Sequence, residues 1–343
     1  DITGQILFLT TLSILVKNLI NLDNIHKNKT EILTILVLFS YAITIKTYFI
    51  LYIPIILVLF FSLQSKINFI KFFFFSKIFI FIGFFIVFFL VLNISATGCL
   101  IYPIEQLCFP EIFKWGLNKD TVLYLSNWYE IWAKAGAGPD FREENPLNYI
   151  QKLNWFENWL DKYFYNKVLE FLGFLLVGLT LVSAIFFKQI NFTKKIYNKR
   201  ILYLNMILLI LLIIWFFNFP TLRYGGYFLL ISIICLTFIS FIKLKNNVIN
   251  FKNKFIFLFS LSLLIFNLKN IERIYEEFNY VAVNYFKSFP YFYVNNVDYS
   301  INYIDNTKVF IVDGMCWSTP SPCLRNTNKK IQKIFTYRVY INK

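Results

Sequence analysis

The polar segment that organises the chain opens with Thr97-Gly98-Cys99-Leu100-Ile101-Tyr102-Pro103 and closes with Asn154-Trp155-Phe156-Glu157-Asn158-Trp159. Residues 97–165 form the only long polar interruption in an otherwise apolar run of about 270 residues, and they hold five of the seven tryptophans. Apolar sequence on both sides of such a segment is typical of membrane spans joined by one large loop. If the protein performs chemistry, we expect this segment to cover the site.

Composition and hydropathy place the chain among membrane proteins. The sequence is 58% apolar and 21% aromatic with a mean hydropathy of +0.58, which is too apolar for a soluble domain of this size. A helix needs about 20 mostly apolar residues to cross the hydrocarbon core. We therefore predict a mainly α, polytopic membrane protein with about eight transmembrane helices, near residues 4–21, 31–46, 48–64, 76–94, 167–187, 201–218, 226–243 and 253–270.

Basic residues gather in four short loops, which all lie on one side if the eight spans alternate. The positive-inside rule makes that side the cytoplasm. The opposite side then receives the Lys46 turn, residues 97–165, the loop 218–225 and everything after about residue 270. Because the net charge of +15 follows this topology, we predict no nucleic-acid partner. The loops contain His26, Lys27, Lys29; Lys66, Lys71, Lys77; Lys188, Lys194, Lys195, Lys199, Arg200; Lys243, Lys245, Lys252, Lys254.

This topology divides the chain into four parts: spans in 1–95, an extracytoplasmic segment in 96–166, spans in 167–270, and an extracytoplasmic cap in 271–343. The pattern of apolar residues predicts two amphipathic helices in the second part, Val122 to Ala135 and Leu147 to Tyr163. We expect their aromatic residues to lie at the membrane interface, and we favour anchoring over sugar stacking for any single one. Period-two alternation predicts short strands in a small α/β cap, at 299–303, 308–312 and 334–340.

Cysteine positions provide an independent test of this topology. Cys99 and Cys108 fall in one outward segment, and Cys316 and Cys323 fall in another. Two close pairs on the outward side are typical of an oxidising compartment, so we predict one disulfide in each pair. Cys235 lies inside a predicted span, where we interpret it as a small packing residue.

Two cationic positions are the main binding candidates. Lys46 lies on a tight outward turn, where it either anchors a helix end or binds a lipid phosphate. Arg223, one of six arginines, lies in the short outward loop Arg223-Tyr224-Gly225-Gly226. A guanidinium suits bidentate phosphate binding, and glycines allow close backbone approach, so we favour a binding role for this loop.

Four motifs resemble an uncharacterised family of bacterial polytopic membrane proteins found among surface-polysaccharide genes. These motifs are the Thr97–Pro103 start with Cys108 and Trp115, Trp132-Ala133-Lys134, Arg223-Tyr224-Gly225, and the Cys316-Trp317 to Pro322-Cys323 ending. That family looks similar to the GT-C class of membrane glycosyltransferases. The resemblance implies a sugar taken from a polyprenyl-phosphate donor on the outer face. It also implies an acidic base or metal ligand in a first outward loop that would precede Asp1, so we expect the chain to be the later part of a longer protein.

The leading functional hypothesis is therefore a glycosyltransferase of the bacterial inner membrane, acting in surface polysaccharide or glycolipid synthesis. Lys46, Arg223 and Tyr224 would hold the donor phosphate, and Glu105, Glu130 or Asp140 would act on the glycan or lipid acceptor. The sequence identifies no cofactor and no metal-ligand cluster. The alternatives are a lipid-linked glycan ligase or polymerase, a transporter or flippase, and a non-catalytic membrane protein.

Overall fold

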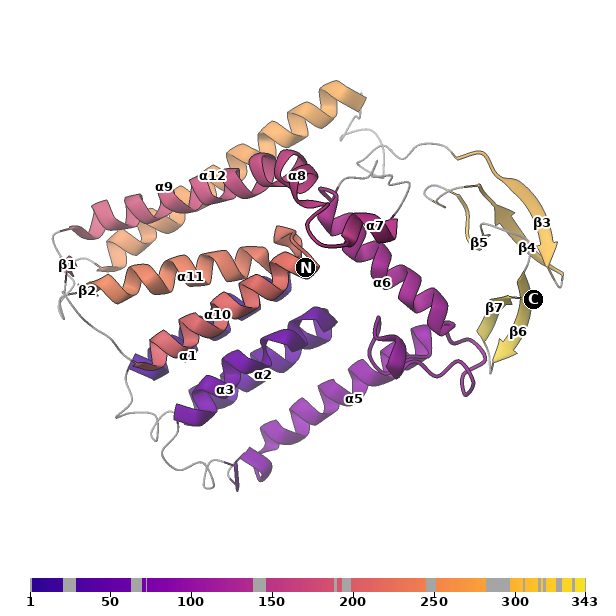
Figure 1. Ribbon diagram of the computed structural model, residues 1–343, viewed down its shortest axis with the longest axis horizontal. Coiled ribbons are helices and arrows are strands. Elements are labelled where there is room, and N and C mark those ends of the chain that lie inside the picture. Colours follow the sequence, from indigo (N-terminus) through magenta and orange to yellow (C-terminus); the bar gives the residue numbers. More distant parts are fainter. Residues whose placement is uncertain are drawn as a thin grey trace. The chain divides into compact units, whose positions relative to one another are not determined.

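The chain is mainly helical in its computed structural model (Figure 1). The structure describes residues 2–20, 29–62, 70–71, 73–137, 146–187, 190–192, 199–244, 251–281, 297–304, 306–313, 316, 319–324, 329–334 and 337–342. The chain divides into two compact units, residues 1–248 and 249–343. The first unit holds most of the helices together with the Lys46 turn, the large polar segment and the Arg223 loop.

Every one of the eight predicted span segments contains an apolar helix. Five of these helices are long and apolar enough to cross a membrane: Ile2–Ile20, Lys77–Thr97, Phe156–Phe186, Lys199–Asn218 and Phe251–Glu276. Three are shorter: Thr30–Ile45, Thr47–Ser62 and Gly226–Ser240. The corresponding elements are α1 (Ile2–Ile20), α2 (Lys29–Ile45), the 3₁₀ turn η2 (Thr47–Tyr52) continued by α3 (Ile53–Ser62), α5 (Lys77–Thr97), α9 (Leu169–Phe186), α10 (Lys199–Asn218), α11 (Gly226–Phe241) and α12 (Phe251–Val281).

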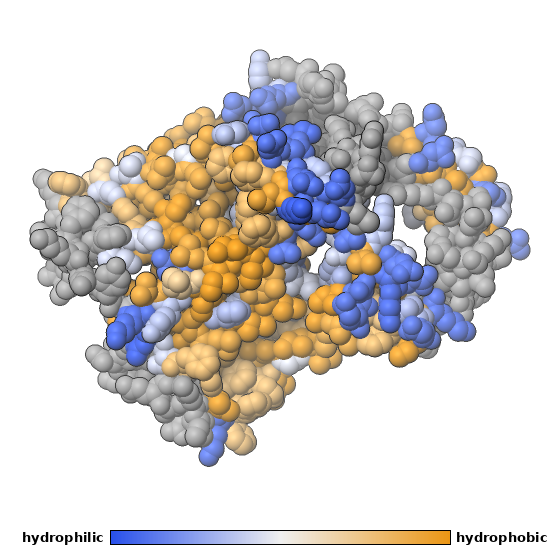
Figure 2. Space-filling model, viewed as in Figure 1, coloured by the Kyte–Doolittle hydropathy of each residue, from blue (hydrophilic) through white to orange (hydrophobic). Residues whose placement is uncertain are grey.

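Helix α5 shows how the sequence determines where an apolar helix begins and ends. The Ser76 side chain caps its N-terminus by accepting a hydrogen bond from the Phe79 N–H, and Gly98 ends it in the left-handed region at φ 73°. Between these caps the helix exposes large apolar side chains such as Phe84 (64% exposed). Figure 2 shows a broad hydrophobic surface over the helices, as expected where lipid is the solvent.

Helices α1, α2, α3, α10 and α11 pack around a shared core in the first unit. Phe8 of α1 lies at the centre of this core, 1% exposed, with four aromatic rings around it. Ring centroids lie 5.3 Å away at Phe39, 4.8 Å at Phe49, 5.0 Å at Tyr52 and 5.4 Å at Phe228. In a membrane such contacts stabilise by close packing rather than by removal of water.

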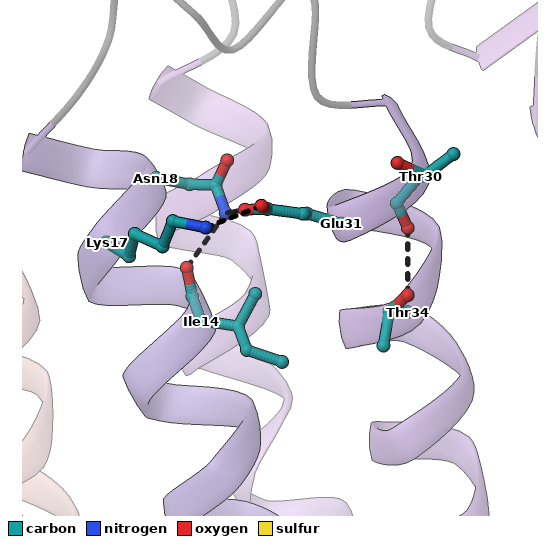
Figure 3. Close-up of polar contacts among 6 residues, drawn as sticks. All are labelled: Ile14, Lys17, Asn18, Thr30, Glu31 and Thr34. Carbon is teal, nitrogen blue, oxygen red and sulfur yellow. Dashed lines mark hydrogen bonds and ion pairs between the residues drawn. The ribbon is translucent and has the colours of Figure 1, made fainter. Parts of the chain in front are cut away.

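A polar cluster joins the C-terminal end of α1 to the N-terminal end of α2 (Figure 3). Glu31 of α2 pairs with Lys17 of α1 at 2.6 Å and accepts a hydrogen bond from the Asn18 amide at 2.9 Å. Strand β1 (Ile190–Phe192), which follows α9, pairs antiparallel with β2 (Ile242–Leu244), which follows α11.

The large polar segment forms a second packed core. Its elements are the 3₁₀ turn η3 (Glu105–Leu107), α6 (Lys119–Lys134), α7 (Pro146–Ile150), α8 (Phe156–Trp159) and the π-helical stretch η4 (Leu160–Val168), which runs directly into α9. Trp155 is 0% and Trp159 4% exposed, and both pack on Phe216 of α10. Protein side chains therefore cover both tryptophans, which do not expose their rings to lipid as the anchoring expected from the sequence would require.

Both predicted disulfides are formed, Cys99–Cys108 in the first unit and Cys316–Cys323 in the second. The second unit carries α12 and two small sheets. One sheet has strand order β3 (Ser300–Ile304), β4 (Thr307–Ile311), β5 (Cys323–Leu324), and the other is the hairpin of β6 (Lys329–Ile334) and β7 (Tyr337–Asn342). The last predicted strand, 334–340, is therefore split between two strands of a hairpin.

Candidate functional site

Lys46 and Arg223 meet at one end of the helix bundle of the first unit. Lys46 follows directly after α2, and Arg223 lies in the 3₁₀ turn η6 (Leu222–Tyr224) between α10 and α11. The Lys46 ammonium lies 4.1 Å from the ring centroid of Tyr224, a cation–π contact. The structure thus brings together all three residues that the sequence assigned to phosphate binding.

The two cations influence each other electrostatically. Burial, and after it the charge of Arg223, lowers the pKa of Lys46 from 10.5 to about 8. Burial also raises the pKa of Tyr224, an effect that Tyr129 strengthens and Arg223 opposes. A like-charge neighbour makes the protonated lysine less stable, and an anion bound nearby would reverse that effect. The electrostatics therefore favour an anionic ligand.

Tryptophan side chains hold the first half of the Arg223 loop. The indole N–H of Trp159 donates to the Pro220 carbonyl at 2.7 Å, and the indole N–H of Trp215 donates to the Thr221 carbonyl at 2.9 Å. Both bonds are buried, where a direct partner matters most because water cannot replace it. One tryptophan comes from the large polar segment and the other from α10, so two separate elements fix this backbone.

Gln5 of α1 holds the second half of the loop. Its amide N–H group donates to the carbonyls of Leu222 at 3.0 Å and Arg223 at 3.1 Å, and its oxygen accepts from the Phe228 N–H at 3.0 Å. The Tyr163 hydroxyl accepts from the Leu222 N–H at 2.8 Å. Four consecutive carbonyls, residues 220–223, therefore each accept a hydrogen bond from a side chain. A backbone held in this way presents Arg223 from a fixed position.

The two glycines after the loop allow close packing within the protein. A Cβ on Gly225, whose φ is +101°, would lie 2.0 Å from the Tyr52 hydroxyl. A Cβ on Gly226 would lie 2.6 Å from the Trp215 ring. Only glycine tolerates both this backbone conformation and this contact at position 225. The close approach that the sequence suggested for a ligand is thus made, at both glycines, by aromatic side chains of the bundle.

Aromatic residues from three segments form a connected group that includes Tyr224. Tyr129 of α6 interacts through its hydroxyl with Tyr102 of the disulfide-closed loop and electrostatically with Tyr224. Burial, followed by Tyr129, raises the pKa of Tyr102 to about 12. Trp132, almost one turn along α6 from Tyr129, packs edge-to-face on Tyr224 with centroids 6.3 Å apart. All four side chains are half-buried.

The candidate catalytic carboxylates lie in other contacts. Glu105, in η3, accepts a hydrogen bond from the Gln106 amide at 2.9 Å. Glu130 of α6 pairs with the buried Lys134 one turn further along the helix. Asp140 lies outside the described residues. Glu130 therefore lies on the same helix as Tyr129 and Trp132, but its carboxylate forms an ion pair with Lys134.

Sequence reasoning missed Gln5 because no short motif marks it. The available signal was a single glutamine near the start of an apolar helix, Ile2–Ile20, where a buried amide needs several partners. The tertiary structure supplies those partners from residues more than 200 positions later in the chain.

Comparison with known protein families gives a match over most of the chain. A family described as Domain of unknown function (DUF8201) matches residues 4–230, which include the Lys46 turn, the large polar segment and the Arg223 loop. No curated protein and no solved structure matches the chain. Within the described residues, no group of three or more His, Cys, Asp or Glu side chains is placed to hold a metal ion.

Proposed function

The chain belongs to the DUF8201 family, and we propose that it is an integral membrane glycosyltransferase that takes a sugar from a polyprenyl-phosphate donor. One observation carries this proposal: at one end of an apolar helix bundle, Lys46 lies over the Tyr224 ring and close enough to Arg223 for the two charges to interact. An anionic headgroup attached to a long apolar tail suits such a place, because the tail stays in the membrane while the phosphate meets the cations.

The proposed topology has eight spans. The three shorter helices also cross the membrane; at 17 residues α2 is about 26 Å long, slightly less than the roughly 30 Å hydrocarbon core, a mismatch that local thinning accommodates. The end with Lys46 and Arg223 faces outward, which places both disulfide pairs in an oxidising compartment. The protein then lies in the bacterial inner membrane.

In the proposed reaction an acceptor hydroxyl loses its proton to a carboxylate, and its oxygen bonds to the anomeric carbon of the donor sugar. The bond from that carbon to the phosphate oxygen breaks, and polyprenyl phosphate leaves with the electron pair. Lys46 and Arg223 stabilise the negative charge that develops on the leaving phosphate. Glu105, Glu130 and Asp140 remain the candidate bases within this chain, and the acceptor is a glycan or a lipid.

The test measures binding of undecaprenyl phosphate to the full-length protein in lipid nanodiscs. We expect saturable binding that weakens about 10- to 100-fold in Arg223→Ala and in Lys46→Ala, since each variant removes a charged hydrogen-bond donor. Arg200→Ala is the matched control, because Arg200 lies at the opposite end of α10. Equal affinity in wild type and both variants, or no saturable binding at all, would refute the proposal.

The identity of the donor distinguishes the ligase alternative from the transferase proposal. A transferase uses a single sugar on polyprenyl phosphate, whereas a ligase requires a preassembled glycan on polyprenyl pyrophosphate. Turnover of only the pyrophosphate-linked glycan by the purified protein would replace the transferase proposal with the ligase one.

A further inference from the structure

The environments of the tryptophans in the large polar segment differ in a way that the sequence could not reveal. Trp155 and Trp159 lie in a protein core, and Trp128 is 43% exposed on the outer face of α6. Trp132 belongs to neither class: it is half-buried and packs on Tyr224, the residue that also contacts Lys46. Its place beside the cation pair calls for an explanation other than core packing or membrane anchoring.

Tyr129 extends the same face of α6, since residues three apart on a helix are neighbours. Its hydroxyl interacts with Tyr102 on one side, and its electrostatic influence reaches Tyr224 on the other. The result is a group of half-buried rings and hydroxyls contributed by the disulfide loop, α6 and the Arg223 loop. None of the members is a carboxylate, so the group suits a neutral ligand portion rather than a second charged one.

Rings with polar edges recognise sugars, because the apolar face of a sugar ring packs on an aromatic ring while its hydroxyls form hydrogen bonds. In a glycosyl phosphate a single oxygen joins the anomeric carbon to phosphorus, so a phosphate bound by Lys46 and Arg223 would hold the sugar ring close to that pair. We propose that Tyr129, Trp132 and Tyr224 form the subsite for the donor sugar, so that the ligand is a phosphate-linked hexose rather than a bare lipid phosphate. This inference rests on the proposed function.

The experiment compares affinities for lipids that differ only in the sugar. The probes are undecaprenyl phosphate and its glucose, mannose, galactose and N-acetylglucosamine derivatives, with the full-length protein in nanodiscs. Wild type should bind at least one derivative several-fold more tightly than the bare lipid. Tyr129→Phe and Trp132→Leu should each reduce that preference about three- to tenfold, the effect expected for one lost hydrogen bond or one lost ring contact.

Two controls lie on the same helix. Tyr124 is 67% and Trp128 43% exposed, so Tyr124→Phe and Trp128→Leu should leave the preference unchanged. A wild type that prefers no derivative over the bare lipid overturns the subsite while leaving the phosphate site intact. Unchanged preference in both Tyr129→Phe and Trp132→Leu, with normal melting temperatures, also overturns it. Failure of wild type to bind even the bare lipid refutes the proposed function instead.

Discussion

Gln5→Met should destabilise the protein more than any other single hydrogen-bonding change in α1. The substitution keeps the side-chain length but removes bonds to the carbonyls of Leu222 and Arg223 and to the N–H of Phe228. Two of these bonds are buried and one is partly buried. At about 1 to 2 kcal/mol for each buried group left without a partner, we expect a loss of about 2 to 4 kcal/mol.

The assay is thermal unfolding of the purified full-length protein in detergent. A loss of this size should lower the melting temperature by about 5 to 10 °C, with Thr10→Val as the control on the same helix. The Thr10 hydroxyl is exposed and donates to the Ile6 carbonyl one turn away, so its loss should cost less than about 0.5 kcal/mol. A Gln5→Met protein that melts within about 1 °C of wild type would show that the loop does not depend on this clamp.

Three further results are expected. Because the pKa of Lys46 is lowered to about 8, lipid-phosphate binding should weaken as the pH rises from 7 to 9.5, and Lys46→Arg should remove this dependence in the same titration. Gly225→Ala should cost about 2 kcal/mol or more, since its Cβ would lie 2.0 Å from a buried tyrosine hydroxyl at positive φ, whereas Gly83→Ala, with nothing within 4 Å, should be tolerated in melting experiments. Glu31→Leu should lower the melting temperature more than Lys17→Leu, because it removes both the Lys17 ion pair and one of the two acceptors of the buried Asn18 amide, whose other acceptor is the Ile14 carbonyl, while the lysine side chain is 58% exposed; the reverse order would contradict this.

The apolar helices were predictable because an apolar run that satisfies its own backbone hydrogen bonds forms an α-helix. All eight predicted segments are helical, but several boundaries differ. The fifth helix begins at Phe156 rather than near 167, since α8 and η4 carry the helix through a polar stretch, and α12 continues to Val281. Hydropathy marks where a chain can enter a membrane, and it does not mark where a helix stops.

The sequence did not predict whether lipid or protein covers the apolar face of an amphipathic helix. The spacing of Trp155 and Trp159 is compatible with a membrane interface or with a protein core, and only the position of α10 decides between them. The alternation of apolar and polar residues near the C-terminal end has a similar weakness. It runs from β6 into β7 and does not indicate that these are two paired strands. Long-range partners, such as those of Gln5, lie beyond any local pattern.

Whether Lys46 and Arg223 anchor helix ends or bind a ligand depends on how firmly they are held. An anchoring cation needs only to reach the headgroup layer, and a flexible side chain on any loop does so. The backbone that carries Arg223 is instead held by side chains of three helices, which bond to the four carbonyls of residues 220–223. Lys46 lies over the half-buried ring of Tyr224, close to the positive charge of Arg223. The positive charge of Arg223 makes the protonated form of Lys46 less favourable, and an anion bound beside both residues would offset that repulsion. A backbone that is rigid beforehand loses little entropy when the anion binds. Rigidity and like charge together therefore favour binding over anchoring.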